Sequence, residues 1–355
     1  MLIHHLWGFP DRQPVGRYAL VAPKLPFTIN DQNPYVAVGK YGKICVVLFM
    51  FLAGIGLYRQ FCSGKLHLWR KIKHFYLSYW KVFFIFIPIA FFFFKDQEQL
   101  TKATVSFYNI YTQFDLNTFI LNLFGLKTSY NSEWWFVFAY AISCIFGYVY
   151  IYMTRKCNNL YIELLIVACI NTVFYRIIPI FIDLSSFSEI KKSAIYTLYL
   201  RQQGVTAFFT GIVAAKYNVL ENMISRMKQH SLPCRIVLSV SGLLATLYIR
   251  NYNSGNIYDF FTAPFIVVFF LTLIKLEKVP FLYKFFVFFG KNSENIWLTH
   301  SFFCYYFSSC VRIVFKTGNY LISLLTLMGM SLLSSICINY VFVIFKKAKE
   351  FYQAR

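Results

Sequence analysis

Acidic residues are scarce in this sequence: 14 Asp and Glu stand against 35 Lys and Arg, and charged residues make up only 14% of the 355 positions. So little charge, beside 58% hydrophobic and 21% aromatic residues, excludes an ordinary soluble globular domain. The net charge of +21 does not indicate a nucleic-acid-binding protein, because the basic residues lie between long apolar runs. In that position they act as topology signals and as contacts for anionic lipid or a phosphorylated ligand.

Cysteine spacing of the kind that marks a metal site or a disulfide framework is also missing. The nine cysteines show no paired spacing, and most of them fall inside apolar runs. We therefore expect them to pack as small hydrophobic residues. The short apolar run after Met1 lacks the small-residue cleavage site of a signal peptide. We therefore expect no metal site, no bound cofactor and no cleaved leader.

Long apolar runs are abundant. A transmembrane helix needs roughly 20 mostly apolar residues, so residues 1–9 are too few, and we expect the first helix to be truncated at the N-terminus. Together with that fragment, the later runs predict an all-α integral membrane protein with about ten transmembrane helices, in which residues 1–355 form a single membrane domain. These runs lie at about 42–58, 75–94, 134–154, 160–182, 194–217, 233–250, 256–276, 293–316 and 319–346.

The loops predict the orientation of the chain in the membrane. If the first helix runs outward, more Lys and Arg fall in the segments on the inside than in those on the outside, although the outer loops are longer. This bias predicts a multi-pass protein with cytoplasmic N- and C-termini. Segments 114–126 and 278–289 have the amphipathic pattern of helices that lie along the outer and the inner membrane surface, respectively.

His4 and His5 lie in the first apolar run and would be near the outer face. Ionisable groups within a bilayer are costly, which makes both histidines functional candidates, and histidine can take or give a proton near neutral pH. Consecutive helical residues point about 100° apart, so only one of the two can face a given pocket. The alternative is an interfacial pair bonded to water and to a backbone carbonyl.

Four cationic residues precede an aromatic run at the predicted inner face. They could hold the phosphates of a nucleotide-like donor; the alternative is that they serve only as positive-inside topology signals. These residues are Arg70, Lys71, Lys73 and His74.

Three further residues are candidates for a cavity or substrate site. Glu133, which precedes two tryptophans at the start of a span, could orient a sugar hydroxyl or pair with Arg176, or be a solvated carboxylate at a helix end. Arg176 lies inside an apolar run and needs a carboxylate, a carbonyl or a water-filled cavity. His300 would follow a helix start capped by Ser293. It could shape the same cavity as His5 or be a core histidine bonded to a neighbouring helix.

Taken in order, these stretches resemble the bacterial acyltransferase 3 family, in its branch of O-acetyltransferases that act on surface polysaccharides. The match is carried by residues 4–12, 42–58, 71–80 and 290–300, with weaker similarity at 133–136 and 211–217. The resemblance implies an acyl-CoA donor, usually acetyl-CoA, and a sugar hydroxyl acceptor on a lipid-linked or exported glycan. It also implies a catalytic histidine in the first helix, which falls on His4 and His5. Where the family often has two arginines, this chain has Lys71 and His74.

We therefore expect a membrane O-acyltransferase in which His5 acts as the general base toward a sugar hydroxyl. An acyl-histidine intermediate is a variant of this mechanism. The four cationic residues would bind the nucleotide end of acetyl-CoA, and Arg176 or His300 would polarise the thioester oxygen. Two non-acyltransferase alternatives remain. A polyprenyl-glycan flippase or other transporter should show inverted repeats, and a polysaccharide polymerase should carry arginines in its large outer loops, whereas residues 95–133 contain none.

Overall fold

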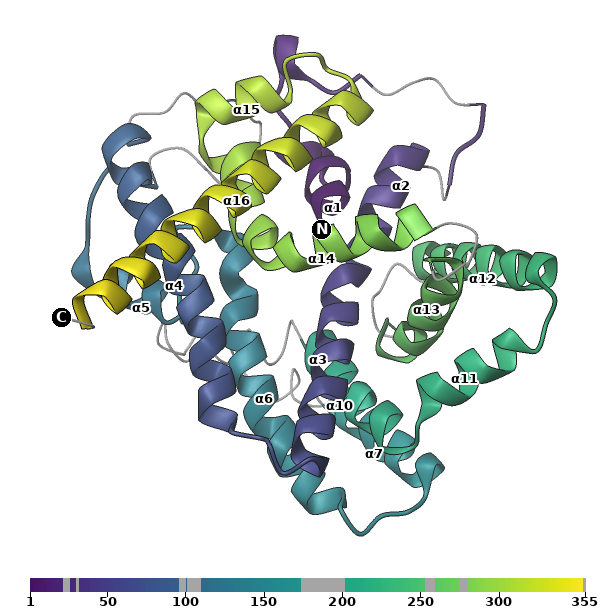
Figure 1. The fold of residues 1–355 in the computed structure, drawn as a ribbon. Helices are drawn as coiled ribbons and strands as arrows, with labels where there is room; N and C mark the ends of the chain where they lie inside the picture. The colour runs from purple at the N-terminus through teal and green to yellow at the C-terminus, as the bar shows by residue number, and fades with distance from the viewer. Residues whose placement is uncertain are drawn as a thin grey trace.

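The computed structural model is built from helices joined by loops, and the described part of the chain contains no β-strand (Figure 1). The predicted all-α class is therefore confirmed. The structure describes residues 1–21, 26–29, 32–95, 100, 110–173, 202–252, 259–274 and 280–353.

The N-terminal half supplies the helices that surround the candidate site. The short helix α1 packs on α2, and α2 leads through Gly42 into α3. Helix α6 contacts both α3 and α4, and the three run side by side in Figure 1. The bounds are α1 (Leu2–Trp7), α2 (Pro34–Tyr41), α3 (Ile44–Cys62), α4 (Leu68–Phe93), α5 (Leu116–Leu123), α6 (Trp135–Thr154) and α7 (Leu160–Thr172).

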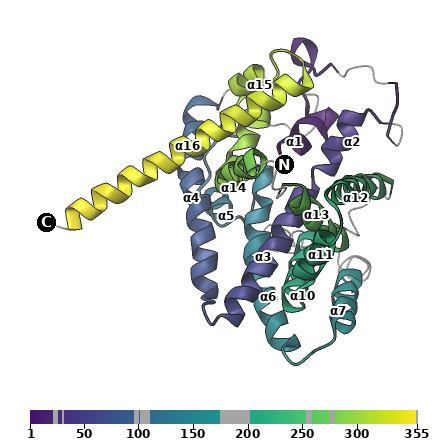
Figure 2. The same cartoon turned by 45° about the vertical axis from the view of Figure 1, so that its right-hand side comes forward.

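The C-terminal half packs against this group. Helix α14 contacts α4 and α16, and α16 projects beyond the other helices toward the C-terminus (Figure 2). A π-helical turn, Phe302–Tyr306, follows α14 directly. The bounds are α10 (Gln202–Lys216), α11 (Val219–Lys228), α12 (Leu232–Tyr252), α13 (Asp259–Ile274), α14 (Pro280–Ser301), α15 (Ser308–Val314) and α16 (Tyr320–Gln353).

Helices α3 and α10 approach each other at two glycines. A Cβ atom on Gly54 would lie 2.0 Å from the carbonyl oxygen of Phe208, and one on Gly211 would lie 2.0 Å from the carbonyl oxygen of Phe51. Any larger residue at either position would force the two backbones apart. Small residues at facing positions are how membrane helices pack closely, because lipid provides no hydrophobic driving force between them.

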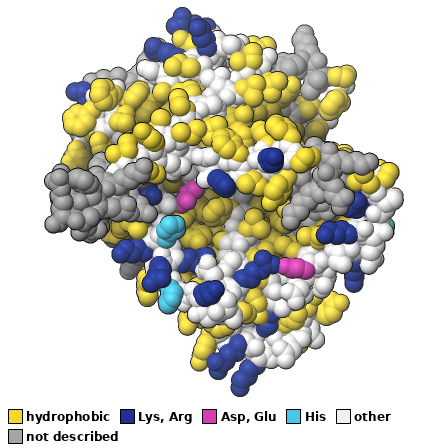
Figure 3. All heavy atoms as spheres, viewed as in Figure 1, with side chains coloured by type: hydrophobic (Ala, Val, Ile, Leu, Met, Phe, Trp, Pro, Cys, Tyr) yellow, Lys and Arg dark blue, Asp and Glu magenta, His cyan; other side chains and the backbone are white. Residues whose placement is uncertain are grey.

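Among the residues that the structure describes, five helical segments are long and apolar enough to cross a membrane: 34–62, 68–93, 132–154, 232–250 and 320–344. Helices of spanning length therefore form at five of the predicted runs, and shorter apolar helices form within others, but the predicted total of about ten spans is not confirmed. Large apolar side chains such as Phe92 and Tyr161 are exposed. Apolar side chains cover much of the face in Figure 3, while Lys and Arg are scattered over its lower half and also gather at its top. This surface suits a protein surrounded by lipid.

The prediction for residues 278–316 was wrong in one respect. Instead of a surface helix followed by a separate span, α14 runs unbroken from Pro280 to Ser301. The hydroxyl of Ser293 does not cap a helix start but donates to the carbonyl of Gly290 at 2.8 Å, a bond made within a continuous helix. The predicted helix within 114–126 does form, as α5, and the Asp115 side chain caps it by accepting from the Thr118 backbone N–H.

Candidate active site

The two adjacent histidines of α1 have different partners. His4 donates its Nδ1–H to the carbonyl oxygen of Gly39 in α2, at 3.0 Å. The helices can approach this closely because Gly8 faces Gly39: a Cβ on Gly39 would lie 2.4 Å from the Gly8 nitrogen. His4 therefore ties α1 to α2, which leaves His5, about 100° further round the helix, to face another set of residues.

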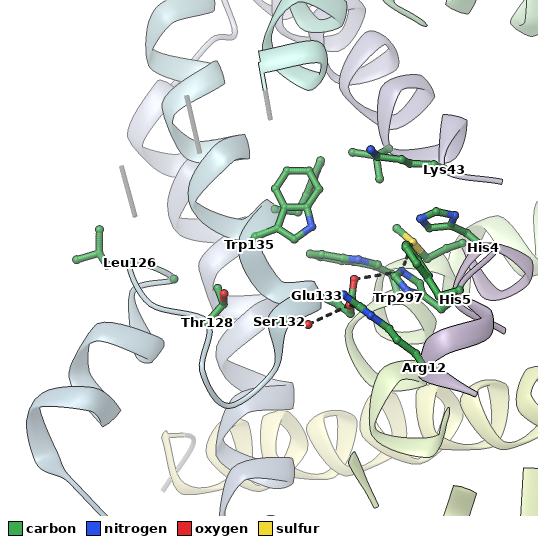
Figure 4. A pocket seen from close by; sticks show the side chains of 15 residues that line it. His4, His5, Arg12, Lys43, Leu126, Thr128, Ser132, Glu133, Trp135 and Trp297 are labelled. Atoms are coloured by element: carbon green, nitrogen blue, oxygen red, sulfur yellow. Dashed lines mark hydrogen bonds and ion pairs between the residues drawn. The ribbon is translucent and has the colours of Figure 1, made fainter. Parts of the chain in front are cut away.

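His5 lies against a carboxylate from a distant part of the chain. Its Nε2 is 3.2 Å from Oε2 of Glu133 and 3.2 Å from the sulfur of Met1 (Figure 4). The hydroxyl of Tyr305 donates to the His5 backbone carbonyl and fixes the helix at this position. His5 and Glu133 are both buried, so their mutual attraction is only weakly screened by water.

Glu133 is held in place from several sides. Its backbone N–H donates to the side chain of Asn131, which caps the turn at the start of α6. Its Oε1 accepts from the hydroxyl of Ser132 at 3.0 Å and from Nη1 of Arg12 at 3.1 Å. Burial, the largest single influence, lowers the pKa of Arg12, but the charge and hydrogen bond of Glu133 together with the nearby Tyr305 and Tyr306 outweigh it, so the pKa is raised. A cation and an anion therefore face each other beside the His5 ring.

The sequence did not predict Arg12 as a site residue, although it lies in the stretch 4–12 that carries the family resemblance. The suggested partner of Glu133, Arg176, lies outside the described residues. The alternative of a solvated carboxylate at a helix end is wrong, because Glu133 is buried and bonded to Arg12. The signal in the sequence was its position just after Gly8 and Pro10, which end the first helix.

His300 lies beside His5 inside the protein. The ring centroids are 4.9 Å apart, and His300 is fully buried near the end of α14. Its Nδ1 is 2.7 Å from the carbonyl oxygen of Trp297 in the same helix. Its bond is therefore made within α14 and not, as in the alternative from the sequence, with a neighbouring helix. His300 contacts His5 but does not itself line the cavity described next.

A cavity of about 420 Å³ opens in front of His5 and Glu133. Its polar lining includes Lys43 and Thr128 together with the two histidines, Arg12 and Ser132. The other walls are aromatic and come from Phe9, Trp135, Phe136 and Trp297. Among the described residues, no group of three or more His, Cys, Asp or Glu side chains could hold a metal ion.

A second cavity of about 340 Å³ adjoins the first and is lined mainly by apolar side chains. The two share Met1, Val46, Phe136 and Trp297. Glu294 of α14 lines the second cavity. This carboxylate accepts a hydrogen bond from Ser78 and interacts electrostatically with His74 of α4. The second cavity thus extends from the His5 site toward the cationic end of α4.

The four cationic residues predicted to bind the donor lie together in the first two turns of α4. Arg70, Lys73 and His74 are exposed, and Lys71 is half-buried. None of the four lines either of the two cavities, and the structure does not place them at His5. His74 interacts with Glu294, which lines the second cavity.

A family model described as an acyltransferase domain, that of the acyltransferase 3 family, matches residues 6–341 of the chain. This protein belongs to that family. The match begins directly after His5 and includes Arg12, Glu133, His300 and the cationic end of α4. No curated protein and no solved structure shows significant similarity to the acyltransferase. The fold and the family together make it a membrane acyltransferase, and the transporter and polymerase alternatives receive no support from the comparison.

Proposed function

We propose that this acyltransferase moves an acetyl group from cytoplasmic acetyl-CoA to a hydroxyl of a cell-surface or lipid-linked glycan. The observation that carries the proposal is the buried His5–Glu133 pair, with Nε2 and Oε2 3.2 Å apart, in a cavity that is also lined by aromatic side chains. Aromatic faces beside a few fixed polar groups suit a sugar ring, which has apolar faces and hydroxyls around its edge.

In the proposed reaction, the ring of His5 takes the proton from the acceptor hydroxyl as the hydroxyl oxygen attacks the thioester carbonyl. The imidazolium that forms is stabilised by the Glu133 carboxylate, which Arg12 keeps ionised. When the C–S bond breaks, the CoA thiolate leaves and receives the proton from His5, so the products are an ester and free CoA. Arg12 and Lys43 line the cavity as cations near the position where the thioester oxygen becomes negative.

The donor would enter from the cytoplasmic side, where we also place both termini of this multi-pass protein. The α4 cations would bind the phosphates of CoA, and the apolar second cavity would hold the pantetheine arm. Because the two cavities share a wall at Met1 and Trp297, the acetyl group could reach His5 without crossing bulk lipid. In this arrangement Arg176 remains a candidate for polarising the thioester, in a part of the chain outside the described residues.

The experiment that tests the function uses membranes from cells with and without the protein, supplied with radiolabelled acetyl-CoA. We expect label to appear as base-labile ester in the glycolipid or polysaccharide fraction only when the protein is present. Labelled propionyl-CoA and a lipid-extracted acceptor fraction, added separately, would identify the acyl group and the acceptor. Label that remains entirely in acetyl-CoA, with the protein intact in the membrane, would contradict the proposal. A covalently labelled protein isolated without acceptor would favour the acyl-histidine variant.

The donor site gives a further prediction. Changing Lys71 and Lys73 together to Gln should raise the KM for acetyl-CoA by roughly tenfold or more, because each lost contact to a phosphate costs about 1 kcal/mol or more. The matched control changes Lys65 and Lys156, two exposed lysines that are also predicted to be cytoplasmic, to Gln. Initial rates at varied acetyl-CoA, at equal membrane abundance, measure the effect. Equal KM values for the two double variants would mean that the α4 lysines only orient the chain.

A further inference from the structure

An apolar groove of about 970 Å³ lies between α2, α3, α12, α13 and α14, and it shares no lining residue with the two cavities described above. None of the described residues that line it is charged. Helix α12 contacts α2 and α13, and α13 contacts α3 (Figure 1). Phe286 joins α14 to this group, since its ring centroid is 4.9 Å from that of Phe270 in α13. Ligand sites have volumes of roughly 300–1,000 Å³, so the groove is large enough to be one.

One side of the groove is open to the surroundings of the protein. Leu52 of α3 and Val240 and Leu244 of α12 line the groove and are exposed. A hydrocarbon chain can therefore enter from the bilayer without first crossing water. Because lipid is as apolar as the groove, burial of the chain adds little affinity. The groove instead determines where the chain lies relative to the rest of the protein.

A cluster of polar residues, Lys40, Tyr41, Arg250 and Asp259, stands where α2 joins the groove; we call it the Arg250 cluster. Tyr41 lines the groove, and its ring centre is 5.8 Å from the guanidinium carbon of Arg250. Nε and Nη2 of Arg250 donate to the two carboxylate oxygens of Asp259, at 2.9 Å and 3.1 Å. Its Nη1 donates to the backbone carbonyl of Lys40 at 2.6 Å. These bonds hold Arg250 at the end of the groove that Tyr41 marks.

Lys43 connects the Arg250 cluster to the cavity in front of His5. It interacts electrostatically with Asp259 of the cluster and with His4. Lys43 and His4 both line the cavity, where Figure 4 shows their side chains near each other. Tyr41, two residues earlier in the chain, lines the groove. The junction of α2 and α3 therefore borders the groove through one residue and the catalytic cavity through the other.

The Arg250 cluster and Lys43 together carry a net positive charge. Lys40, Lys43 and Arg250 are cationic, and Asp259 supplies one negative charge against them. The side chain of Lys40 is exposed. Basic groups between transmembrane helices suit the phosphate of a lipid head group. A sugar attached to a phosphate at Lys43 would lie at the cavity that Lys43 lines.

We propose that the groove binds the hydrocarbon chain of a lipid-linked acceptor, whose phosphate lies at Lys40 and Lys43 and whose sugar enters the cavity of His5. This rests on the proposed function and narrows its acceptor to a glycan that is still attached to a lipid phosphate. The acceptor enters sideways from the bilayer, whereas acetyl-CoA enters through the second cavity. The two substrates therefore reach His5 by separate routes.

Photolabelling tests this binding site without depending on acyl transfer. The protein is placed in phosphatidylcholine vesicles with a polyprenyl phosphate that carries a diazirine in its chain, and the labelled peptides are sequenced. We expect label within residues 240–247 of α12 and 266–271 of α13, which line the groove, and its displacement by excess unlabelled polyprenyl phosphate. Label elsewhere on the protein would overturn the proposal. So would equal displacement by phosphatidylglycerol, which would mean that the groove takes any anionic bilayer lipid, or by uncharged polyprenol, which would mean that no phosphate is recognised.

A matched pair of variants tests the same groove in catalysis. Val240→Trp combined with Leu244→Trp fills the groove at two exposed positions. The control, Val237→Trp combined with Leu238→Trp, changes two exposed residues of α12 that do not line it. The groove variant should lower kcat/KM for the lipid-linked acceptor by about 10-fold or more, because displacing a reacting group by about 1 Å can cost about 10²-fold in rate. The control should leave it unchanged.

The same glycan released from its lipid shows whether the loss comes from the chain. We expect the groove variant to acetylate the free glycan at the rate of the unaltered protein. Equal kcat/KM for the two variants with the lipid-linked acceptor, or equal losses with both acceptors, would overturn the proposal. If photolabelling gives the expected result but no form of the protein transfers an acyl group, the proposed function fails and the lipid site stands.

Discussion

Replacing His5 by Ala should abolish acyl transfer, with a loss of at least about 10²-fold in kcat, because a positioned general base contributes about that much or more. Its Nε2 is the histidine nitrogen that lies 3.2 Å from the Glu133 carboxylate at the cavity. Ester formation from radiolabelled acetyl-CoA in isolated membranes, and acetylation of the glycan in cells, would both measure the loss. The variant and the unaltered protein must be compared at matched membrane abundance.

The neighbouring residue provides the control. His4 donates to the Gly39 carbonyl, so His4→Ala should lower activity less, and mainly by lowering the amount of folded protein. A cavity left by the missing ring would loosen the contact between α1 and α2 without removing the base. Full acyl transfer by His5→Ala would refute the assignment of the base. Full transfer when both histidines are changed would refute the histidine mechanism altogether.

Replacing Glu133 by Gln should lower kcat by about 10²-fold or more, the size of effect expected when a buried charge that stabilises the transition state is lost. The amide keeps the shape of the side chain but no longer balances the imidazolium that forms at His5. It also leaves Arg12 beside a neutral group in a largely buried position, which costs stability. Initial rates and thermal unfolding in the same detergent measure the two effects separately.

Two further variants separate catalysis from folding at this position. Changing both Glu133 and Arg12 to Gln removes the uncompensated charge and should recover stability, but not kcat. Glu221→Gln removes an acidic residue from an exposed pair with Arg59 and should change neither property, since exposed pairs contribute little. Activity restored by the Glu133 and Arg12 double change would mean that the carboxylate serves only to neutralise Arg12.

Several structural features could be predicted from local patterns in the chain. The apolar runs predicted the all-α membrane class, and five of the roughly ten predicted spans form helices of spanning length in the described part of the chain. This much is local, because the hydrophobicity of a helix is a property of consecutive residues. The order of the short motifs predicted the acyltransferase 3 family, and the match of the family model to residues 6–341 confirms that prediction. The unusual occurrence of His4 and His5 in an apolar run was visible as well. The expectation that only one of the two could face a given pocket was wrong, because both line the same cavity, although they bond to different partners.

The contacts that make the candidate site could not be predicted in this way, because they join residues far apart in the sequence. Arg12 pairs with Glu133, and His5 contacts both Glu133 and His300, only after α1, the start of α6 and the end of α14 have packed together. Local propensity also misplaced a boundary at Ser293, where packing of α14 against α4 and α16 favours one continuous helix. The sequence by itself determined which ionisable groups the chain would place among apolar residues. The tertiary structure decided which of them face one another, since a buried charge or ring nitrogen is stable only where the fold supplies its partner.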